Sequence, residues 1–131
     1  LNGAGGNILE HVRAFFEKKT TEAEQHGVNK NRLCFDPGIG FGKTNEENFA
    51  LIANPEKIRV PGTALLMAAS RKRAIGAVCG NPPFEDRMAG TVAAHTASVL
   101  FGADMVRAHD TFETVQAARV ADAIKQFRKG V

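Results

Sequence analysis

The sequence predicts an α/β fold in which three parallel strands alternate with helices. Short apolar runs recur along the chain, and each ends in charged or polar residues before a helix-like stretch begins. These runs alternate little between apolar and polar residues, which is typical of parallel strands covered on both faces. The apolar content of 44% and charged content of 24% are globular values. We therefore expect the polar groups that follow the strands to meet at one rim of the sheet.

Capping residues and helical spacing define the expected elements. Asn7 can cap the first helix, and Gly27 suits the left-handed stop at its end. Asn45 is expected to cap the second helix, and Asp110 begins the last helix with Glu113 as its capping-box partner. The expected helices cover 8–26, 45–53, 73–78, 85–100 and the stretch from 110, and the expected strands cover 33–35, 63–69 and 103–108.

The length of the chain limits its architecture. A complete (β/α)₈ barrel needs about 250 residues, whereas this chain has 131 residues and three predicted strands. An open three-stranded layer would leave the first strand with an unpaired apolar edge, and we expect apolar surface along Leu33–Phe35. These observations favour the C-terminal portion of a TIM (β/α)₈ barrel, with no linker and no second domain within residues 1–131.

Composition argues against nucleic acid and membrane partners. The net charge is +3, with acids and bases interspersed, and the basic run Arg71–Arg73 is too short to follow a phosphate backbone. No apolar run approaches the ~18 residues of a membrane span, and no signal peptide is evident. We expect a cytoplasmic protein in which Cys34 and Cys79 are reduced, packed thiols.

The glycine-rich segment 36–43 follows the first strand and matches neither common nucleotide-binding motif. Its spacing departs from the P-loop by one residue, and its glycines are spaced by twos, unlike the Rossmann pattern. Asp36 stands at the strand end, where a buried carboxylate needs donors. A 2-amino-pyrimidinone ring would offer two adjacent N–H groups. A helix cap or an Asp-Pro-Gly turn explains Asp36 equally well.

The other two strands also end in cationic groups. Ser70 precedes Arg71 and Lys72, which suit an anionic or carbonyl-bearing ligand, because cations at a helix start oppose its dipole. Arg107 and His109 lie two residues apart on a strand and so share a face, where they suit a phosphate.

The remaining histidines suggest no chemistry of their own. We expect His11 and His26 to be solvated and His95 to be a satisfied core or interface residue. The four histidines show no metal-ligand spacing, and the sequence suggests neither a Ser-His nor a Cys-His nucleophile pair.

Three blocks, 33–43, 70–72 and 107–110, together resemble the dihydropteroate synthases of the pterin-binding family. The resemblance covers essentially the whole chain and implies strands six, seven and eight of a TIM barrel, from the fifth helix to the eighth. It implies condensation of 6-hydroxymethyl-7,8-dihydropterin diphosphate with p-aminobenzoate, giving 7,8-dihydropteroate and pyrophosphate. One departure is Ala68-Ala69, where the family commonly has a glycine.

The resemblance also assigns roles to individual residues. Asp36 would accept hydrogen bonds from the pterin, Lys72 would contact its carbonyl and ring nitrogen, and Arg107 would lie along it; these three are the expected catalytic residues. Arg107 and His109 would hold the diphosphate. The p-aminobenzoate pocket would be formed by Phe41, Ser70 and Arg71.

The same resemblance implies Mg²⁺ bound through the substrate diphosphate, with its protein ligand outside this chain, and a homodimer for the intact enzyme. Because the first five strands have no counterpart here, we expect the chain alone not to turn over substrate. Two alternatives stay open. One is a methyltetrahydrofolate-dependent methyltransferase of the same family, and the other is a non-catalytic half-barrel fragment that associates through its strand edge.

Overall fold

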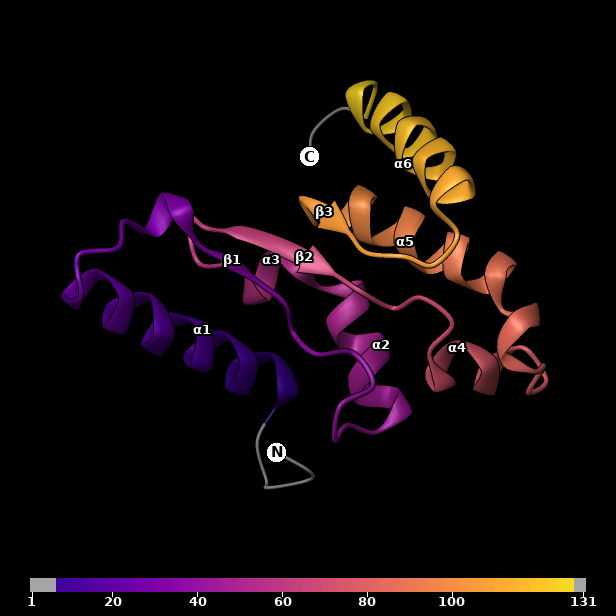
Figure 1. Ribbon diagram of the computed structural model, residues 1–131, viewed down its shortest axis with the longest axis horizontal. Coiled ribbons are helices and arrows are strands. Elements are labelled where there is room, and N and C mark those ends of the chain that lie inside the picture. The colour runs from indigo at the N-terminus through magenta and orange to yellow at the C-terminus, as the bar shows by residue number, and fades with distance from the viewer. Residues whose placement is uncertain (1–6, 129–131) are drawn as a thin grey trace.

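A three-stranded parallel sheet forms the centre of the fold (Figure 1). The computed structural model describes residues 7–128. The strands are β1 (Cys34–Phe35), β2 (Ala64–Met67) and β3 (Met105–Val106), in the order β1-β2-β3. Cys34 pairs with Ala64, and Leu66 pairs with Met105. The predicted α/β class with three parallel strands is confirmed.

The helices begin and end close to the predicted bounds. Thr44, rather than Asn45, caps the second helix, through a capping box with Glu47. A short helix that was not predicted begins at Pro55, where the missing N–H costs nothing. The helices are α1 (Ile8–Gln25), α2 (Asn45–Ala53), α3 (Pro55–Ile58), α4 (Arg73–Val78), α5 (Met88–Phe101) and α6 (Thr111–Gln126), with 3₁₀ turns η1 (Lys30–Arg32) and η2 (Phe84–Asp86).

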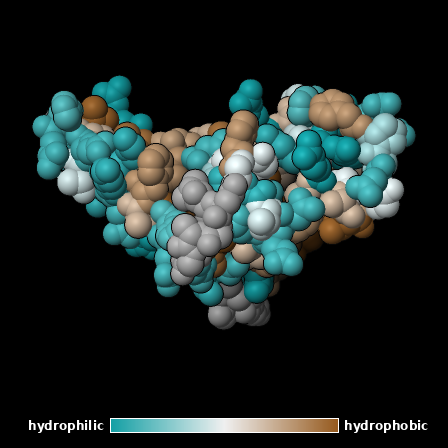
Figure 2. Space-filling model, turned by 90° about the horizontal axis from the view of Figure 1, so that it is seen from below, coloured by the Kyte–Doolittle hydropathy of each residue, from teal (hydrophilic) through white to brown (hydrophobic). Residues whose placement is uncertain are grey.

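Helices cover one face of the sheet. Leu65 and Met67 of β2 are fully buried on that face, beside Phe16 of α1, whose ring stacks on Phe35 with centroids 4.6 Å apart. Figure 1 shows α1 and α2 beside β1 and β2, whereas α5 lies against β3. Seen from below, the side formed by α1, α2 and α4 is mainly hydrophilic, with apolar groups scattered over it (Figure 2).

The opposite face of the sheet is open within residues 7–128, so the expectation of two covered faces is wrong. Cys34 and Met105 are exposed there, and Leu66 is half-buried. The strands are apolar on both faces, as the interior of a closed barrel requires, but helices pack on one of them. Cys34 and Cys79 are both free and exposed, so the prediction of packed thiols is wrong.

Apolar side chains are also exposed along α6. Small and polar residues, Thr114 and Ala121, are its buried positions. The large apolar residues of α6 and of its C-cap all exceed 40% exposure: Phe112, Val115, Val120, Ile124 and Phe127. Leu33 and Phe35 at the β1 edge are half-buried, so apolar surface is more extensive on α6 than along the predicted edge. Among the described residues, no helix combines the length and apolar character needed to cross a lipid bilayer.

Asp104 ties the start of β3 to β2. Its carboxylate accepts the Leu65 backbone N–H at 2.8 Å and pairs with Arg59 at 2.6 Å. Arg59 also donates to the carbonyls of Thr63 and Gly102. Burial would raise the pKa of Asp104, but its hydrogen bonds with Arg59 and Leu65 outweigh burial and lower it. One side chain thus extends the sheet pairing beyond the short strands.

His95 is buried in α5 at 1% exposure, as the sequence predicts for a core histidine. Its Nε2 accepts the Ala69 backbone N–H at 3.0 Å, whereas its Nδ1 is buried without a hydrogen-bond partner among the described residues. Burial lowers the pKa of His95 from 6.5 to about 4. The imidazole is therefore neutral in the folded chain near pH 7.

Replacing Asp104 with alanine should destabilise the chain. Leu65 is 1% exposed, so its N–H would be left without an acceptor, at a cost of roughly 1–3 kcal/mol. Asp104→Asn keeps an acceptor oxygen and should cost less, because the exposed ion pair contributes only about 0.2–1 kcal/mol. Urea denaturation of the two variants measures both changes. Equal stabilities of Asp104→Ala and wild type would contradict the role of this side chain.

Acid should weaken the fold through His95 before most carboxylates titrate. The unfolded chain takes up the proton near the ordinary pKa of 6.5, and the folded chain does so only near pH 4. The resulting stability is complete above pH 6.5 and is lost as the pH falls toward 4. The free energy of unfolding, measured by urea between pH 7 and 5, should fall more steeply in wild type than in His95→Gln. Parallel slopes would contradict a neutral, buried His95.

Candidate active site

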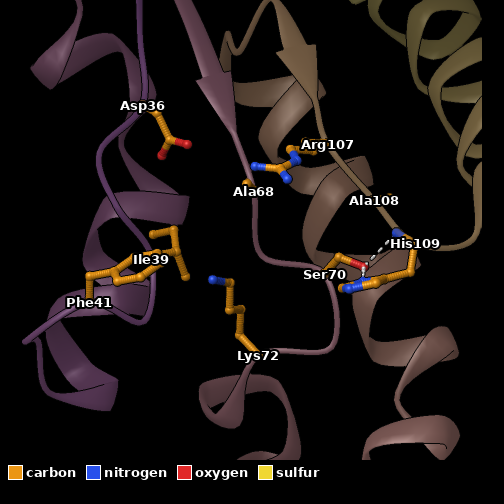
Figure 3. A pocket seen from close by; sticks show the side chains of 9 residues that line it. All are labelled: Asp36, Ile39, Phe41, Ala68, Ser70, Lys72, Arg107, Ala108 and His109. Atoms are coloured by element: carbon orange, nitrogen blue, oxygen red, sulfur yellow. Dashed lines mark hydrogen bonds between the residues drawn. The ribbon is translucent and has the colours of Figure 1, made fainter.

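One cavity lies at the carboxyl ends of the three strands (Figure 3). Asp36 follows β1, Ala68 and Ser70 follow β2, and Arg107 follows β3. The Asp36 carboxylate, the Lys72 ammonium and the Arg107 guanidinium point into the space between these strand ends (Figure 3). The lining residues are Asp36, Ile39, Phe41, Ala68, Ser70, Lys72, Arg107, Ala108 and His109.

The structure brings together six of the seven predicted site residues. Asp36, Phe41, Ser70, Lys72, Arg107 and His109 all line the cavity, and Arg71 does not. Sequence reasoning missed Ile39, Ala68 and Ala108 as lining residues. The sequence nevertheless carried a signal for each of them, because Ala68 and Ala108 lie at the ends of the predicted strands 63–69 and 103–108, and Ile39 is the aliphatic residue of the glycine-rich segment.

Asp36 forms the turn that the sequence allowed, and it also faces the cavity. Its Oδ1 accepts the Gly38 backbone N–H at 2.8 Å, which is the Asp-Pro-Gly turn. The side chain is exposed rather than buried, so the expectation of a desolvated carboxylate is wrong. The turn uses one oxygen as an acceptor, and the other oxygen remains available to donors that enter the cavity.

The glycine-rich segment is a compact turn that positions Phe41. Gly40 has φ +87, and a Cβ there would lie 3.2 Å from Lys72 Cδ, so this position requires glycine. Lys43 Nζ donates to the carbonyls of Gly38 and Phe41 and closes the loop. Burial lowers the pKa of Lys43. The Phe41 ring lies with its centroid 4.4 Å from Lys72 Nζ, a cation–π contact at the edge of the cavity.

Ser70 and His109 form a hydrogen-bonded pair, which corrects the expectation that no Ser-His pair exists. The Ser70 hydroxyl is 2.7 Å from His109 Nδ1 and accepts the His109 backbone N–H at 3.0 Å. The Phe84 ring contacts the imidazole edge-on, with centroids 5.3 Å apart. Because Ser70 occupies Nδ1, Nε2 is the ring nitrogen that a cavity ligand can reach. The buried Ser70 hydroxyl therefore orients His109, because it bonds both the ring and the backbone of that residue.

Arg71 points away from the cavity and links two strand ends. Its guanidinium donates to both carboxylate oxygens of Asp110, at 3.2 and 2.8 Å, and lies 5.1 Å from the Phe84 ring centroid. The hydrogen bond from Arg71 lowers the pKa of Asp110. This pairing explains why Asp110 makes no side-chain cap on α6, in contrast to the predicted capping box with Glu113.

The charges in the cavity favour an anion beside a hydrogen-bonding ring. Lys72 and Arg107 are two cationic side chains, His109 offers a ring nitrogen, and Asp36 is the one carboxylate among the described lining residues. Within residues 7–128, no three His, Cys, Asp or Glu side chains come together as metal ligands. Such a site can hold a flat ring with adjacent N–H donors near its carboxylate and a phosphate near its cations.

Comparison with known proteins identifies the family. The sequence model of the family described as "Pterin binding enzyme" matches residues 2–109. The chain belongs to this family. The Synechocystis dihydropteroate synthase is 36% identical over 119 residues, and the Escherichia coli K12 enzyme of the same name is 35% identical over 117 residues. The alignments cover 91% and 89% of this chain and 41% of each relative.

Solved structures of pterin-binding enzymes share the fold. A Xanthomonas albilineans dihydropteroate synthase with 4-aminobenzoic acid matches at TM-score 0.87 and 37% identity, covering 93% of this chain and 45% of that one. A Coxiella burnetii dihydropteroate synthase in complex with pteroic acid matches at TM-score 0.90 and 30% identity, covering 97% and 47%. The three strands and their helices therefore correspond to a portion of the TIM barrel of these enzymes, as predicted. The chain spans under half the length of these relatives.

Proposed function

We propose that this chain supplies the pterin- and diphosphate-binding part of a dihydropteroate synthase. The proposed reaction joins 6-hydroxymethyl-7,8-dihydropterin diphosphate to p-aminobenzoate and yields 7,8-dihydropteroate and pyrophosphate. One observation carries the proposal: Asp36, Lys72, Arg107 and His109 follow three different strands and line one cavity. The sequence places these groups up to 73 positions apart, and parallel pairing brings them to one rim.

Each charged group has a proposed role that fits its position. The Asp36 carboxylate accepts N–H bonds from the 2-amino-pyrimidinone edge of the pterin, and Lys72 donates to its carbonyl and ring nitrogen. Arg107 lies along the ring and, with His109 Nε2, holds the diphosphate. We propose Asp36, Lys72 and Arg107 as the catalytic residues.

The p-aminobenzoate pocket is supported for some of its predicted residues. Phe41 is 69% exposed at the edge of the cavity, where its ring can pack on an aromatic substrate. Ser70 lines the same cavity but engages His109. Arg71 turns to Asp110, and we therefore assign it to the wall behind the site. The X. albilineans relative was solved with 4-aminobenzoic acid, and we extend that substrate to this chain.

The proposed chemistry needs orientation and charge stabilisation rather than a nucleophilic side chain. The bond between the methylene carbon and the diphosphate oxygen breaks, and pyrophosphate leaves with the electron pair. The amine of p-aminobenzoate then bonds to the carbon and loses a proton. Arg107 and His109 stabilise charge that grows on the leaving group, whereas Lys72 and Asp36 hold the ring in line for attack.

Magnesium does not fit the described residues as a protein-held ion. Mg²⁺ favours oxygen ligands in octahedral geometry, and the cavity lining offers one carboxylate beside cationic groups. The proposed Mg²⁺ would therefore arrive with the diphosphate, with any protein ligand outside this chain. The homodimer of the intact enzyme and the cytoplasmic location also stay proposals.

Two alternatives predict different behaviour. A methyltetrahydrofolate-dependent methyltransferase would bind the pterin without needing the phosphates, which leaves Arg107 and His109 unexplained. A non-catalytic half barrel would associate through the open strand edges and ignore both substrates. The pair of cation-capable groups after β3 favours the synthase, because a departing diphosphate carries several negative charges.

The 131-residue chain should bind the pterin diphosphate without producing dihydropteroate. Calorimetry with 6-hydroxymethyl-7,8-dihydropterin diphosphate should show binding that weakens about tenfold or more in Lys72→Ala, because charge-assisted hydrogen bonds contribute about 1.5–3 kcal/mol. Lys57→Ala, an exposed lysine on α3 outside the cavity lining, is the matched control and should bind as wild type does.

Three outcomes would count against parts of this proposal. Equal affinity for the pterin with and without its diphosphate would favour the methyltransferase. Absence of binding by the folded wild type would favour the non-catalytic half barrel. Steady dihydropteroate formation from both substrates, followed by chromatography, would overturn the expectation that the chain alone is inactive.

A further inference from the structure

One face of α5 holds the turn that carries Ser70 and Lys72. Arg87, Thr91 and His95 are spaced by four residues, so their side chains lie on the same side of the helix. Arg87 is the residue at the helix start, and the other two are 1% exposed. None of the three lines the cavity. Their polar atoms bind other parts of the chain instead.

All three side chains bind backbone groups of the same short segment. His95 Nε2 accepts the Ala69 N–H at 3.0 Å, and Thr91 Oγ1 accepts the Arg71 N–H at 2.8 Å. Arg87 donates to the Arg71 carbonyl at 3.1 Å, and it is braced by a second bond to the Pro82 carbonyl. The residues on either side of Ser70 are thereby fixed to α5.

This segment requires outside support, because its backbone is strained. Arg71 has φ +55, a left-handed conformation that costs a non-glycine residue about 1 kcal/mol or more. The segment closes on itself through the Lys72 N–H and the Ala69 carbonyl at 3.2 Å. The left-handed residue sends the Arg71 side chain to Asp110 and leaves Ser70 and Lys72 facing the cavity.

We propose that His95 is a positioning residue of the cavity, which acts through the Ala69 N–H, together with Thr91 and Arg87, to hold Ser70 and Lys72 in place. His95 touches no cavity ligand itself. Its acceptor atom must be unprotonated, so the proton of the neutral ring is on Nδ1. If Nε2 carried a proton, its N–H would face the Ala69 N–H, and this hydrogen bond would be lost because neither group could accept. The side chain therefore does more than fill volume in α5.

The proposal rests on the proposed function only for the choice of ligand. The role of His95 in holding residues 69–72 rests on the hydrogen bonds described above. His95→Phe keeps a ring of similar size and removes the acceptor, whereas His95→Gln restores an acceptor. Ser98→Ala is the matched control, because Ser98 is also fully buried and its hydroxyl bonds only within its own helix, to the Ala94 carbonyl.

Nitrogen NMR of the wild-type chain should show His95 as the Nδ1–H tautomer. In His95→Phe, amide hydrogen exchange should accelerate at least about tenfold at Ala69, and shifts should change at Ser70, Lys72 and His109. Affinity for 6-hydroxymethyl-7,8-dihydropterin diphosphate should fall about tenfold. His95→Gln should recover part of each effect, and Ser98→Ala should leave all of them at wild-type values.

Other results would overturn the proposal. These are an Nε2–H tautomer, shift changes spread evenly along α5 with none concentrated at 69–72, or equal effects of His95→Phe and Ser98→Ala. If His95→Phe does not fold, Thr91→Val removes the neighbouring acceptor and should accelerate exchange at Arg71 but not at Ala69; unchanged exchange at Arg71 would count against the proposal. If wild type fails to bind the pterin, the proposed function fails, and the tautomer and exchange measurements still decide the role of His95.

Discussion

The parallel pairing of β2 with β1 on one side and β3 on the other is the constraint on which the cavity depends. Parallel strands end at the same edge of a sheet, so Asp36, Lys72 and Arg107 meet there although long stretches of chain separate them. The strands themselves are short, with two to four residues each. Asp104 extends the β2–β3 pairing with a side chain, which keeps the two strand ends in register.

The sequence was sufficient to predict which groups stand at the strand ends, because each follows an apolar run directly. It was insufficient to predict where Arg71 points. Residues 70–72 are adjacent and all polar, and the direction of each side chain depends on the left-handed backbone at Arg71, which is rare outside glycine. The Ser70–His109 bond also lay beyond prediction, since it joins residues 39 positions apart through the register of two strands.

Burial was the least predictable property, for a physical reason. The sequence does not distinguish an apolar strand residue that is covered by helices from one that faces the interior of a barrel. In β2, Leu65 and Met67 pack on helices, whereas Ala64 and Leu66 lie on the open face and are half-buried. The exposure of Cys34 and of the large apolar side chains on α6 was unpredictable for the same reason. Apolar composition indicates that a surface is suited to burial, and the partners that bury it belong to the tertiary structure.

Hydrogen bonds from α5 and from the end of β3, and not apolar packing alone, hold the segment that carries Ser70 and Lys72. These bonds fix the positions of the cavity side chains more closely than apolar packing would. A hydrogen bond restricts both distance and direction, whereas an apolar contact restricts mainly distance. The segment 69–71 receives three such bonds from α5, and the Arg71–Asp110 pair and the Ser70–His109 pair tie the same segment to the end of β3. Lys72 is long and flexible, so the entropy lost on fixing it is large. The hydrogen bonds on both sides of Ser70 already restrict the backbone of this segment. A ligand therefore has to order only the Lys72 side chain and not the backbone that carries it. A cavity built on three short strands can therefore still present a defined set of charges.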